Sequence, residues 1–268
     1  MKIQPLYWKL YIPQHIFFMI GLLTIINGTT SYWWLVATYI GYAVMGYIGG
    51  AIFIHRYWCH ESFETYPFLA RLGAYLGAMS GMGSPLAMTA VHLYMHHAYS
   101  DTEKDPHTPN FQGKFYSWVS WKNKPLEHFK PAFSLMLRSR KNVIRDKFVV
   151  YLHKNFDKIY WGTFLLLLII NWKFALFFYM GGGVLSFHIE GFVNTFCHGA
   201  SSNGYRIADT DDKSMNHASK FMMFLSLGNT LHHNHHVFPK NYSYKLKDGE
   251  FDLAHYLVPL ITTKYKNK

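Results

Sequence analysis

The fold is decided by the segment Gly228-Asn-Thr-Leu-His-His-Asn-His-His-Val-Phe-Pro239, which places four histidines within five residues. Two more histidine boxes precede it, His55-Arg-Tyr-Trp-Cys-His60 and His92-Leu-Tyr-Met-His96-His97. A single histidine is more often a satisfied core or loop residue than a ligand, but three boxes in one chain are hard to attribute to chance. The boxes therefore predict a metal site.

The number of histidines indicates how many ions the site holds. Without His233, the three boxes supply eight imidazoles, more than one ion can use, which favours two ions; imidazole alone does not select the metal. On a helix His232 and His236 share a face, whereas His235 is displaced by about 60° and can reach a second ion. A ninth candidate ligand is His198, near the end of an apolar segment; the alternative is an interfacial histidine without a ligand role.

Apolar segments organise the rest of the chain. Half of its 268 residues are hydrophobic and only 15% are charged, below the usual quarter. The segments 12–26, 32–54, 159–170 and 174–189 are predicted transmembrane helices, and 32–54 contains no charge and is long enough by itself. We expect an all-α integral membrane protein, one domain over residues 1–268, with helical metal-binding regions at 55–158 and 190–268.

The distribution of basic residues predicts the topology. With four crossings, the connectors 27–31 and 171–173 lie on one face, and 25 of the 26 lysines and arginines lie on the other. The positive-inside rule places that basic face, with both termini and all three boxes, in the cytoplasm. Another crossing within 65–91 would separate the first box from the second. We instead predict an interfacial helix over 67–79, broken after Met79 by a cluster of glycine, serine and proline.

The net charge of +11 fits a membrane protein with basic cytoplasmic loops. The run from Arg138 to Lys147 favours contact with anionic lipid headgroups. The alternative is a docking surface for an acidic redox protein or an acyl carrier. Nucleic-acid binding is not expected, because no recognised nucleic-acid-binding signature accompanies the charge.

These features resemble the membrane-bound fatty acid desaturase family, specifically its acyl-CoA and delta-9 acyl-lipid branch. The resemblance covers roughly residues 40 to 255. In chain order, the matching pieces are the first box with the following Glu-Ser-Phe, His96-His97-Ala-Tyr-Ser-Asp101, Asp105-Pro-His107, Asn194-Thr-Phe-Cys-His198, His232 to Pro239 and Glu250-Phe-Asp-Leu253.

The resemblance implies an oxidoreductase that acts on paired donors and reduces dioxygen to water. A di-iron centre would introduce a cis double bond, at the delta-9 position, into a saturated fatty acyl chain carried by coenzyme A, a glycerolipid or an acyl carrier protein. Electrons would come from a separate donor such as ferredoxin or a b-type cytochrome, because the chain has no attached cytochrome or flavin domain.

The resemblance also implies a ligand set. No catalytic residue is expected beyond the metal ligands and their water-mediated contact, and the motifs identify no substrate-binding residue. One iron would be held by His55, His60, His92, His97 and His235, and the other by His96, His198, His232 and His236, with Asn194 acting through a bound water.

The middle box departs from the family pattern, which is usually His-x-x-His-His. Here three residues separate His92 from His96, so that on a regular helix His92 pairs with His96 rather than with His97. The division of these three histidines between the two metals therefore stays open. A local π-bulge would restore the family arrangement.

Three alternative functions remain at the level of sequence. A hydroxylase or ketolase acting on a lipid or hydrocarbon shares the boxes but inserts oxygen. A non-redox, histidine-rich membrane metal-binding protein would need ligands near the middle of the bilayer, whereas the boxes fall outside the predicted spans. A structural membrane protein with incidental histidines would tolerate the replacement of His235.

Overall fold

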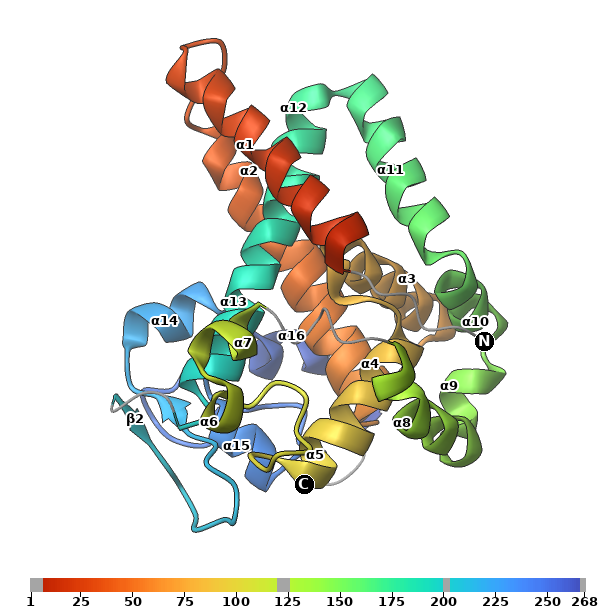
Figure 1. The fold of residues 1–268 in the computed structure, drawn as a ribbon, viewed down its shortest axis with the longest axis vertical. Helices are drawn as coiled ribbons and strands as arrows, with labels where there is room; N and C mark the ends of the chain where they lie inside the picture. Colours follow the sequence, from red (N-terminus) through yellow and green to blue (C-terminus); the bar gives the residue numbers. More distant parts are fainter. Residues whose placement is uncertain (1–6, 120–125, 200–202, 266–268) are drawn as a thin grey trace.

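Two helical hairpins form the upper half of the molecule, with their turns at the same end (Figure 1). The computed structural model describes residues 7–119, 126–199 and 203–265. The first hairpin consists of the π-helical turn η1 (Tyr7–Tyr11), α1 (Ile12–Ile26), α2 (Trp34–Gly41) and its π-helical continuation η2 (Tyr42–Cys59). The second consists of α11 (Phe156–Ile170), α12 (Trp172–Phe174), the π-helical segment η6 (Ala175–Gly181) and α13 (Gly182–Phe196).

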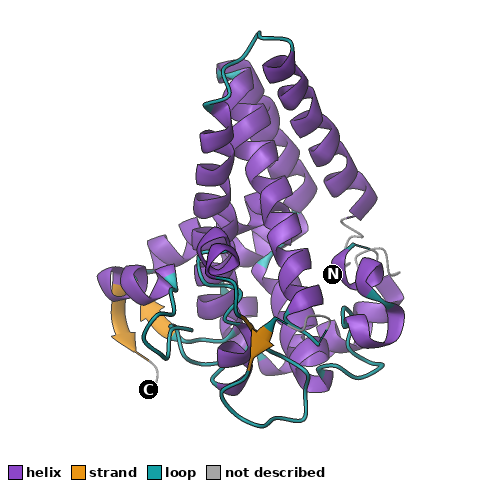
Figure 2. Ribbon diagram, turned by 90° about the vertical axis from the view of Figure 1, so that its left-hand side faces the viewer, coloured by secondary structure: helices purple, strands orange, loops and turns teal. Residues whose placement is uncertain are grey.

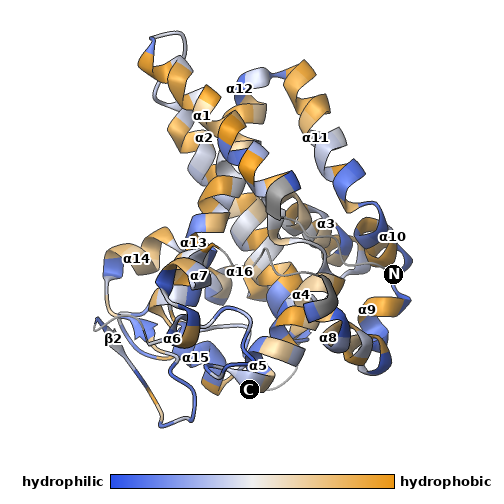
Figure 3. Ribbon diagram, viewed as in Figure 1, coloured by the Kyte–Doolittle hydropathy of each residue, from blue (hydrophilic) through white to orange (hydrophobic). Residues whose placement is uncertain are grey.

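Three helical runs of the described chain are long and apolar enough to cross a membrane. They are Lys9–Ile26, Trp34–Cys59 and Trp172–Phe196. Apolar residues predominate along these hairpin helices, whereas the lower loops are polar (Figure 3). Helix α11 covers the predicted segment 159–170 and exposes apolar side chains such as Ile169, but it has only 15 residues. The chain is thus a membrane protein with three candidate spans.

The last apolar helix is longer than its composition indicates. The sequence predicts an end at Ile189, but α13 continues to Phe196. The hydropathy falls at Glu190 and Asn194, but both side chains line a cavity and the helix continues through them. This extension brings His198 into the lower half of the molecule.

Glycines allow the two hairpins to cross closely. A Cβ atom at Gly41 would lie 2.0 Å from the carbonyl oxygen of Phe178, and one at Gly182 would lie 2.6 Å from the backbone of Gly41. Small residues permit such backbone approach between membrane helices. The crossing fixes η2 and α13 against each other, and these two helices lead to His55 and His198.

Buried polar side chains connect α11 to the other helices. The amide of Gln14, on α1, donates to the hydroxyl of Tyr160 at 2.8 Å. The hydroxyl of Tyr179, on η6, donates to the carbonyl oxygen of Tyr160 at 2.9 Å. All three side chains are buried, so α11 packs as part of one helical bundle.

The lower half consists of short helices and loops. Its helical elements are α3 (Pro67–Gly77), η3 (Ala78–Met82), α4 (Pro85–Val91), η4 (His92–His96), α5 (His97–Tyr99), α6 (Pro109–Gln112), α7 (Lys114–Trp118), α8 (Leu126–Ser139), α9 (Lys141–Arg145), α10 (Lys147–Lys154), α14 (Lys220–Leu225), α15 (His232–Val237) and α16 (Leu253–Ile261). The main apolar core extends from the hairpins into α3, α4 and α10, through residues such as Met45, Met79, Leu86 and Leu152.

The segment between the first two boxes folds back on itself. The predicted helix over 67–79 is present as α3 and the beginning of η3; its position at a membrane interface stays a prediction. The chain then reverses at Gly81 and Gly83, whose φ angles of 94° and 88° favour glycine. Ser84 caps α4 by accepting a hydrogen bond from the backbone N–H of Ala87 (3.3 Å). The reversal keeps both boxes at the same end of the bundle.

The chain is mostly, but not entirely, helical (Figure 2). Strand β1 (Phe63–Thr65) pairs antiparallel with β4 (Thr262–Tyr265), and β2 (Gly204–Tyr205) pairs antiparallel with β3 (Asn216–His217). The fold is thus mostly helical, as expected, with two short strand pairs that the sequence does not predict. They form because extended segments on either side of the histidine boxes satisfy each other's backbone hydrogen bonds.

Candidate metal centre

The first two histidine boxes each place two imidazoles five residues apart on a π-helical turn. The backbone N–H of His60 donates to the carbonyl oxygen of His55 at 3.0 Å. In the middle box the N–H of His97 likewise donates to the carbonyl oxygen of His92. An i to i+5 bond puts residues five apart on one face. His92 therefore pairs with His97, and the extra residue of the middle box is accommodated.

The third box forms α15, whose imidazoles diverge toward two neighbours. The Nε2 atoms of His232 and His236 lie 3.1 Å apart on one face, as their spacing predicts. The Nε2 atom of His235 instead lies 2.9 Å from that of His97. One short helix thus contributes to two groups of imidazoles.

The orientation of α15 is fixed by Asn234, which is buried in the middle of the box. Its side-chain amide donates to the carbonyl oxygen of Tyr244 at 2.7 Å and to the carboxylate of Glu250 at 3.1 Å. Its backbone N–H donates to the side-chain oxygen of Asn216 at 3.1 Å. These bonds explain why an asparagine stands among the histidines.

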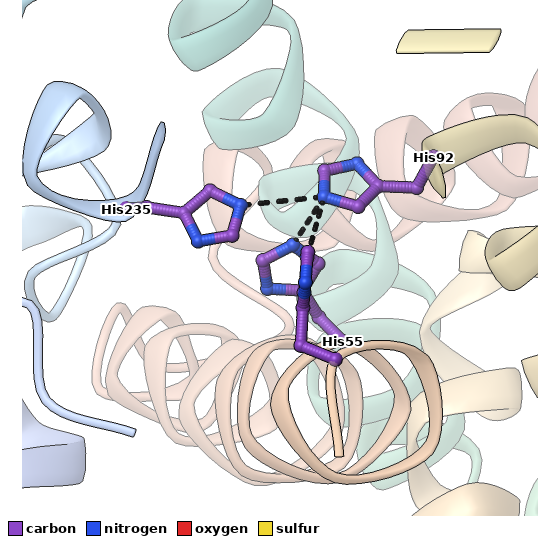
Figure 4. A group of neighbouring side chains, drawn as sticks. His55, His92 and His235 are labelled. Carbon is purple, nitrogen blue, oxygen red and sulfur yellow. Dashed lines mark hydrogen bonds between the residues drawn. The ribbon is translucent and has the colours of Figure 1, made fainter. Parts of the chain in front are cut away.

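Five imidazoles form the first group, here called cluster A: His55, His60, His92, His97 and His235. The Nε2 atom of His92 is central, with the other four Nε2 atoms 2.7–3.3 Å from it. Figure 4 shows His55, His92 and His235 pointing toward one another from η2, η4 and α15. Every member except His97 is at most 8% exposed. Cluster A is therefore a buried, nitrogen-rich site.

Four imidazoles form the second group, here called cluster B: His96, His198, His232 and His236. Neighbouring Nε2 atoms lie 2.8–3.2 Å apart. The two clusters adjoin, because the ring of His97 in cluster A stacks on that of His236 in cluster B with centroids 4.7 Å apart. All nine histidines that the sequence singles out thus meet in two neighbouring groups.

Three aspartates contact the Nδ1 atoms of imidazoles in cluster B. The Nδ1 atoms of His96 and His198 each lie 3.0 Å from a carboxylate oxygen, of Asp105 and Asp101 respectively. The Nδ1 atom of His236 lies 2.8 Å from a carboxylate oxygen of Asp212. A proton held on Nδ1 by a carboxylate leaves Nε2 as the free donor atom.

The donor atoms of both clusters fit a metal site. In cluster B, an Nδ1 proton shared with each aspartate would leave three Nε2 lone pairs facing one another, and such lone pairs repel unless a cation lies between them. Nitrogen atoms bonded at about 2.1 Å to one metal lie about 3 Å apart when the bonds meet at right angles. The observed Nε2 separations in clusters A and B have this value.

Burial keeps most of these imidazoles neutral. It lowers the pKa of His60 to about 3, and together with neighbouring imidazoles it lowers the pKa of His92 and His232 well below 6.5. His198 differs: burial lowers its pKa, but the hydrogen bond and charge of Asp101 outweigh that effect and raise it. Because the neutral imidazole is the metal-binding form, most of the site is prepared for a cation near neutral pH.

A cavity of about 100 Å³ adjoins both clusters. Its walls include His55 and His92 of cluster A and His232 of cluster B, and the other walls are largely apolar. Asn194 lines the same cavity, is 7% exposed, and its side-chain nitrogen has no hydrogen-bond partner within the described residues. The cavity therefore offers an apolar ligand direct access to the imidazoles.

Other histidines of the chain have separate surroundings. His233 lies outside both clusters and bonds through Nδ1 to the hydroxyl of Ser214 at 2.8 Å. The ring of His107 lies 4.2 Å from that of His96 and lines the cavity. His153 belongs to neither cluster, and its Nδ1 atom lies 2.6 Å from the hydroxyl oxygen of Ser84.

Two contributors to the site are missed by the sequence reasoning. Asp212 supports His236, and the hydroxyl of Tyr244 lies 3.0 Å from Nδ1 of His55. The chain offers one signal for the aspartate: three of its 15 acidic residues fall within positions 209–212. Tyr244 has no comparable signal among 20 tyrosines.

Comparison with protein families matches residues 31–261, most of the chain, to the family described as fatty acid desaturase. The matched range contains all three histidine boxes and every member of clusters A and B.

Characterised proteins similar to this chain carry related names. The sn-1 stearoyl-lipid 9-desaturase of Anabaena variabilis is 30% identical over 221 residues, covering 82% of this chain and 77% of that protein. The acyl-CoA C20 delta5-desaturase of Anemone leveillei is 28% identical over 82% of this chain and 68% of its own length. The delta-9 acyl-lipid desaturase 1 of Arabidopsis thaliana is 26% identical, with 80% and 68% covered.

Proposed function

The chain belongs to the fatty acid desaturase family and is an oxidoreductase; from this premise we propose that it introduces a cis double bond into a saturated acyl chain, with dioxygen as co-substrate, at a pair of iron ions. The observation that carries the proposal is the meeting of nine imidazoles in two adjoining buried clusters beside an apolar cavity. Iron bound there would supply the oxidant that an unactivated C–H bond requires.

The ligand assignment follows the two clusters. Cluster A would hold one ion and cluster B the other, with Asn194 contacting the second ion through a water. In support, Asn194 and His232 line the same cavity, and the amide nitrogen of Asn194 has no protein partner in the described part of the chain. Iron is compatible with an all-imidazole set, which by itself does not discriminate between transition metals.

The protein's own part in the reaction is positioning. Apolar side chains such as Met88, Val91 and Val193 line the cavity next to the imidazoles. An acyl chain held among them would present one methylene to the metal pair while water is excluded. Holding the reacting groups in this orientation increases the rate of the reaction. Tyr244, bonded to Nδ1 of His55 and lining the cavity, would keep that imidazole oriented toward its partners.

The proposed topology has four crossings, with α11 as the short third span and the clusters on the cytoplasmic face. The bonds from Gln14 and Tyr179 to Tyr160 support it, because they tie α11 into the same bundle as the three longer spans. The turns of both hairpins lie at one end (Figure 1). The excess of lysine and arginine outside those turns supports the assignment of sides.

The proposed substrate is a fatty acyl group on a lipid or on coenzyme A, desaturated at the delta-9 position. Two relatives named for position 9, from Anabaena variabilis and Arabidopsis thaliana, support this choice over position 5, the position named for the Anemone leveillei relative. Electrons would come from a separate carrier such as ferredoxin or a b-type cytochrome.

The test is the fatty acid profile, by gas chromatography with mass spectrometry, of a desaturase-deficient host expressing this chain with a compatible electron donor. We expect new unsaturated chains, which locate the double bond, and their loss in His235→Ala. The matched control is His233→Gln, because His233 belongs to the same box but lies outside both clusters. Hydroxylated or keto products would show that the protein inserts oxygen into its substrate instead of desaturating it. Metal binding without dioxygen consumption would indicate a non-redox protein.

A further inference from the structure

The two clusters differ in the groups that contact the Nδ1 atoms of their imidazoles. Three of the four imidazoles in cluster B bond through Nδ1 to carboxylates. In cluster A, Nδ1 of His55 meets only the neutral hydroxyl of Tyr244, and within the described residues no carboxylate forms an ion pair with any of its five members. Nδ1 of His235 is buried without a partner in that same part of the chain.

We propose that the two clusters bind metal unequally, and that cluster B takes up the first ion and holds it more tightly than cluster A holds the second. The inference rests on the two-metal part of the proposed function. It assigns Asp101, Asp105 and Asp212 a role as positioning residues that act through the imidazoles they contact.

The first reason is charge. A carboxylate that accepts the Nδ1 proton makes the imidazole a stronger donor and sets its orientation. Asp101 and Asp105 are at most 8% exposed, and the side chain of Asp212 is 15% exposed. Their charges therefore act on a cation through a medium that screens less than water does.

Cluster A has the opposite surroundings. The guanidinium of Arg56 lies 3.7 Å from the ring centroid of Tyr244, the residue that contacts His55. Its charge is matched by Asp252, with N and O atoms 3.3 Å apart. This buried ion pair is therefore self-balanced and adds no net negative charge beside cluster A.

The second reason is rigidity. One carboxylate oxygen of Asp101 accepts bonds from the side chains of Thr108 and Asn110, both at 2.8 Å, and the other accepts the backbone N–H of Lys213 at 2.8 Å. These bonds fix Asp101 independently of any metal. They also join two loops across cluster B.

Asp105 and Asp212 are fixed in the same way. Asp105 accepts the backbone N–H groups of Asp101 at 3.0 Å and of His107 at 3.2 Å. Asp212 accepts the hydroxyl groups of Thr210 at 2.8 Å and of Ser214 at 2.7 Å. Cluster B is thus preorganised. Binding of an ion there requires less ordering of side chains, which lowers the entropic cost of binding.

The test is a titration of metal-free protein in detergent with Co²⁺, followed by its visible absorption and by calorimetry. Wild type is expected to bind two ions in separate steps. His232→Ala, in cluster B, should abolish the tight step and leave the weak one. His60→Ala, in cluster A, should abolish the weak step and leave the tight one.

A charge variant isolates the aspartates from the ligands. Asp212→Asn should weaken the tight step by about 10- to 100-fold, the usual effect of an outer partner on metal affinity, and leave the weak step unchanged. Asp211→Asn is the matched control, since Asp211 is adjacent and exposed. It should change neither step.

The outcomes separate this inference from the function it rests on. Two steps of equal affinity, or a tight step that is lost in His60→Ala and retained in His232→Ala, would overturn the inference while leaving a two-metal centre. An unchanged tight step in Asp212→Asn would overturn the role of the carboxylates. Failure of the folded wild type to bind any metal would overturn both the inference and the proposed function.

Discussion

His92 and His97 are five residues apart in the chain, and their Nε2 atoms lie 2.9 Å apart because a π-helical turn carries both imidazoles on one face. The pair His55 and His60 repeats this arrangement with the same spacing. Two of the three histidine boxes therefore depend on the same irregular backbone geometry.

Inserting an alanine after Leu93 should dismantle cluster A. The insertion places the second histidine of the His96-His97 pair six positions after His92, a separation that neither an α-helical nor a π-helical turn brings to one face, so that cluster A loses at least one imidazole. The iron content measured by plasma mass spectrometry should fall from two ions per chain toward one. Leu93→Ala keeps the spacing and should retain both ions; an insertion variant with full occupancy would contradict the role of the π-helical turn.

The metal-free protein should lose stability as the pH falls below about 6.5. Burial lowers the pKa of His60 to about 3 and also lowers those of His92 and His235, whereas unfolded imidazoles titrate near 6.5. Between these values the unfolded state binds protons that the folded state does not, so stability is complete above pH 6.5 and decreases below it. Each such imidazole contributes about 1.4 kcal/mol per pH unit.

Thermal unfolding in detergent at pH 7.5, 6.5 and 5.5 measures this effect. The Tm should be nearly constant between the first two values and fall at the third. Two groups act in the opposite direction, because burial raises the pKa of Asp105 to about 6 and the carboxylate of Asp101 raises the pKa of His198, but they are fewer than the imidazoles whose pKa is lowered. A Tm that rises on acidification would refute the prediction.

Gly46→Ala should destabilise the helix crossing beside the cavity. A Cβ atom at Gly46 would lie 2.1 Å from the hydroxyl oxygen of Ser186, and such overpacking costs about 1–3 kcal/mol. Adding Ser186→Gly to the same chain removes the blocking atoms and should recover much of the lost Tm. If the double variant is no more stable than Gly46→Ala, steric contact with Ser186 is not the cause.

Asp252→Ala should be among the most damaging substitutions outside the clusters. Asp252 is fully buried, pairs with buried Arg56 and accepts the backbone N–H of Tyr244. Its removal leaves the Arg56 charge buried and unpaired, which costs about 3–5 kcal/mol. Thermal unfolding should show a large fall in Tm, and the double variant Arg56→Met, Asp252→Leu should be less destabilised than Asp252→Ala alone.

The sequence predicts much of the scaffold, because apolar runs and turn residues are local signals. The helix at 12–26 and the reversal after Met79 lie where the chain indicates, and the second apolar helix begins near its predicted start but continues five residues past Ile54, to Cys59. The end of α13 is misplaced by seven residues, because composition does not show whether Glu190 faces lipid or a cavity. The sequence does not predict the strand pairs, because each pair joins short segments that are distant in sequence or separated by a loop.

The sequence predicts which histidines form the site better than it predicts which of them share a cluster. Nine histidines follow from the boxes and from the resemblance to a known family, and all nine converge. The pairing of His92 required the backbone, since α-helical and π-helical turns of the same residues give different partners. The support from Asp212 and Tyr244 depends on folding between residues 24 and 189 positions apart.

Cluster A also sets the order in which the protein can mature. His55 and His235 come from segments 180 residues apart, and the strand pair that joins residues 63–65 to 262–265 closes the same region. A ribosome has released the first hairpin long before it makes α15. Cluster A is therefore complete only after the third box has been synthesised, so any ion that it binds can be acquired only after that point.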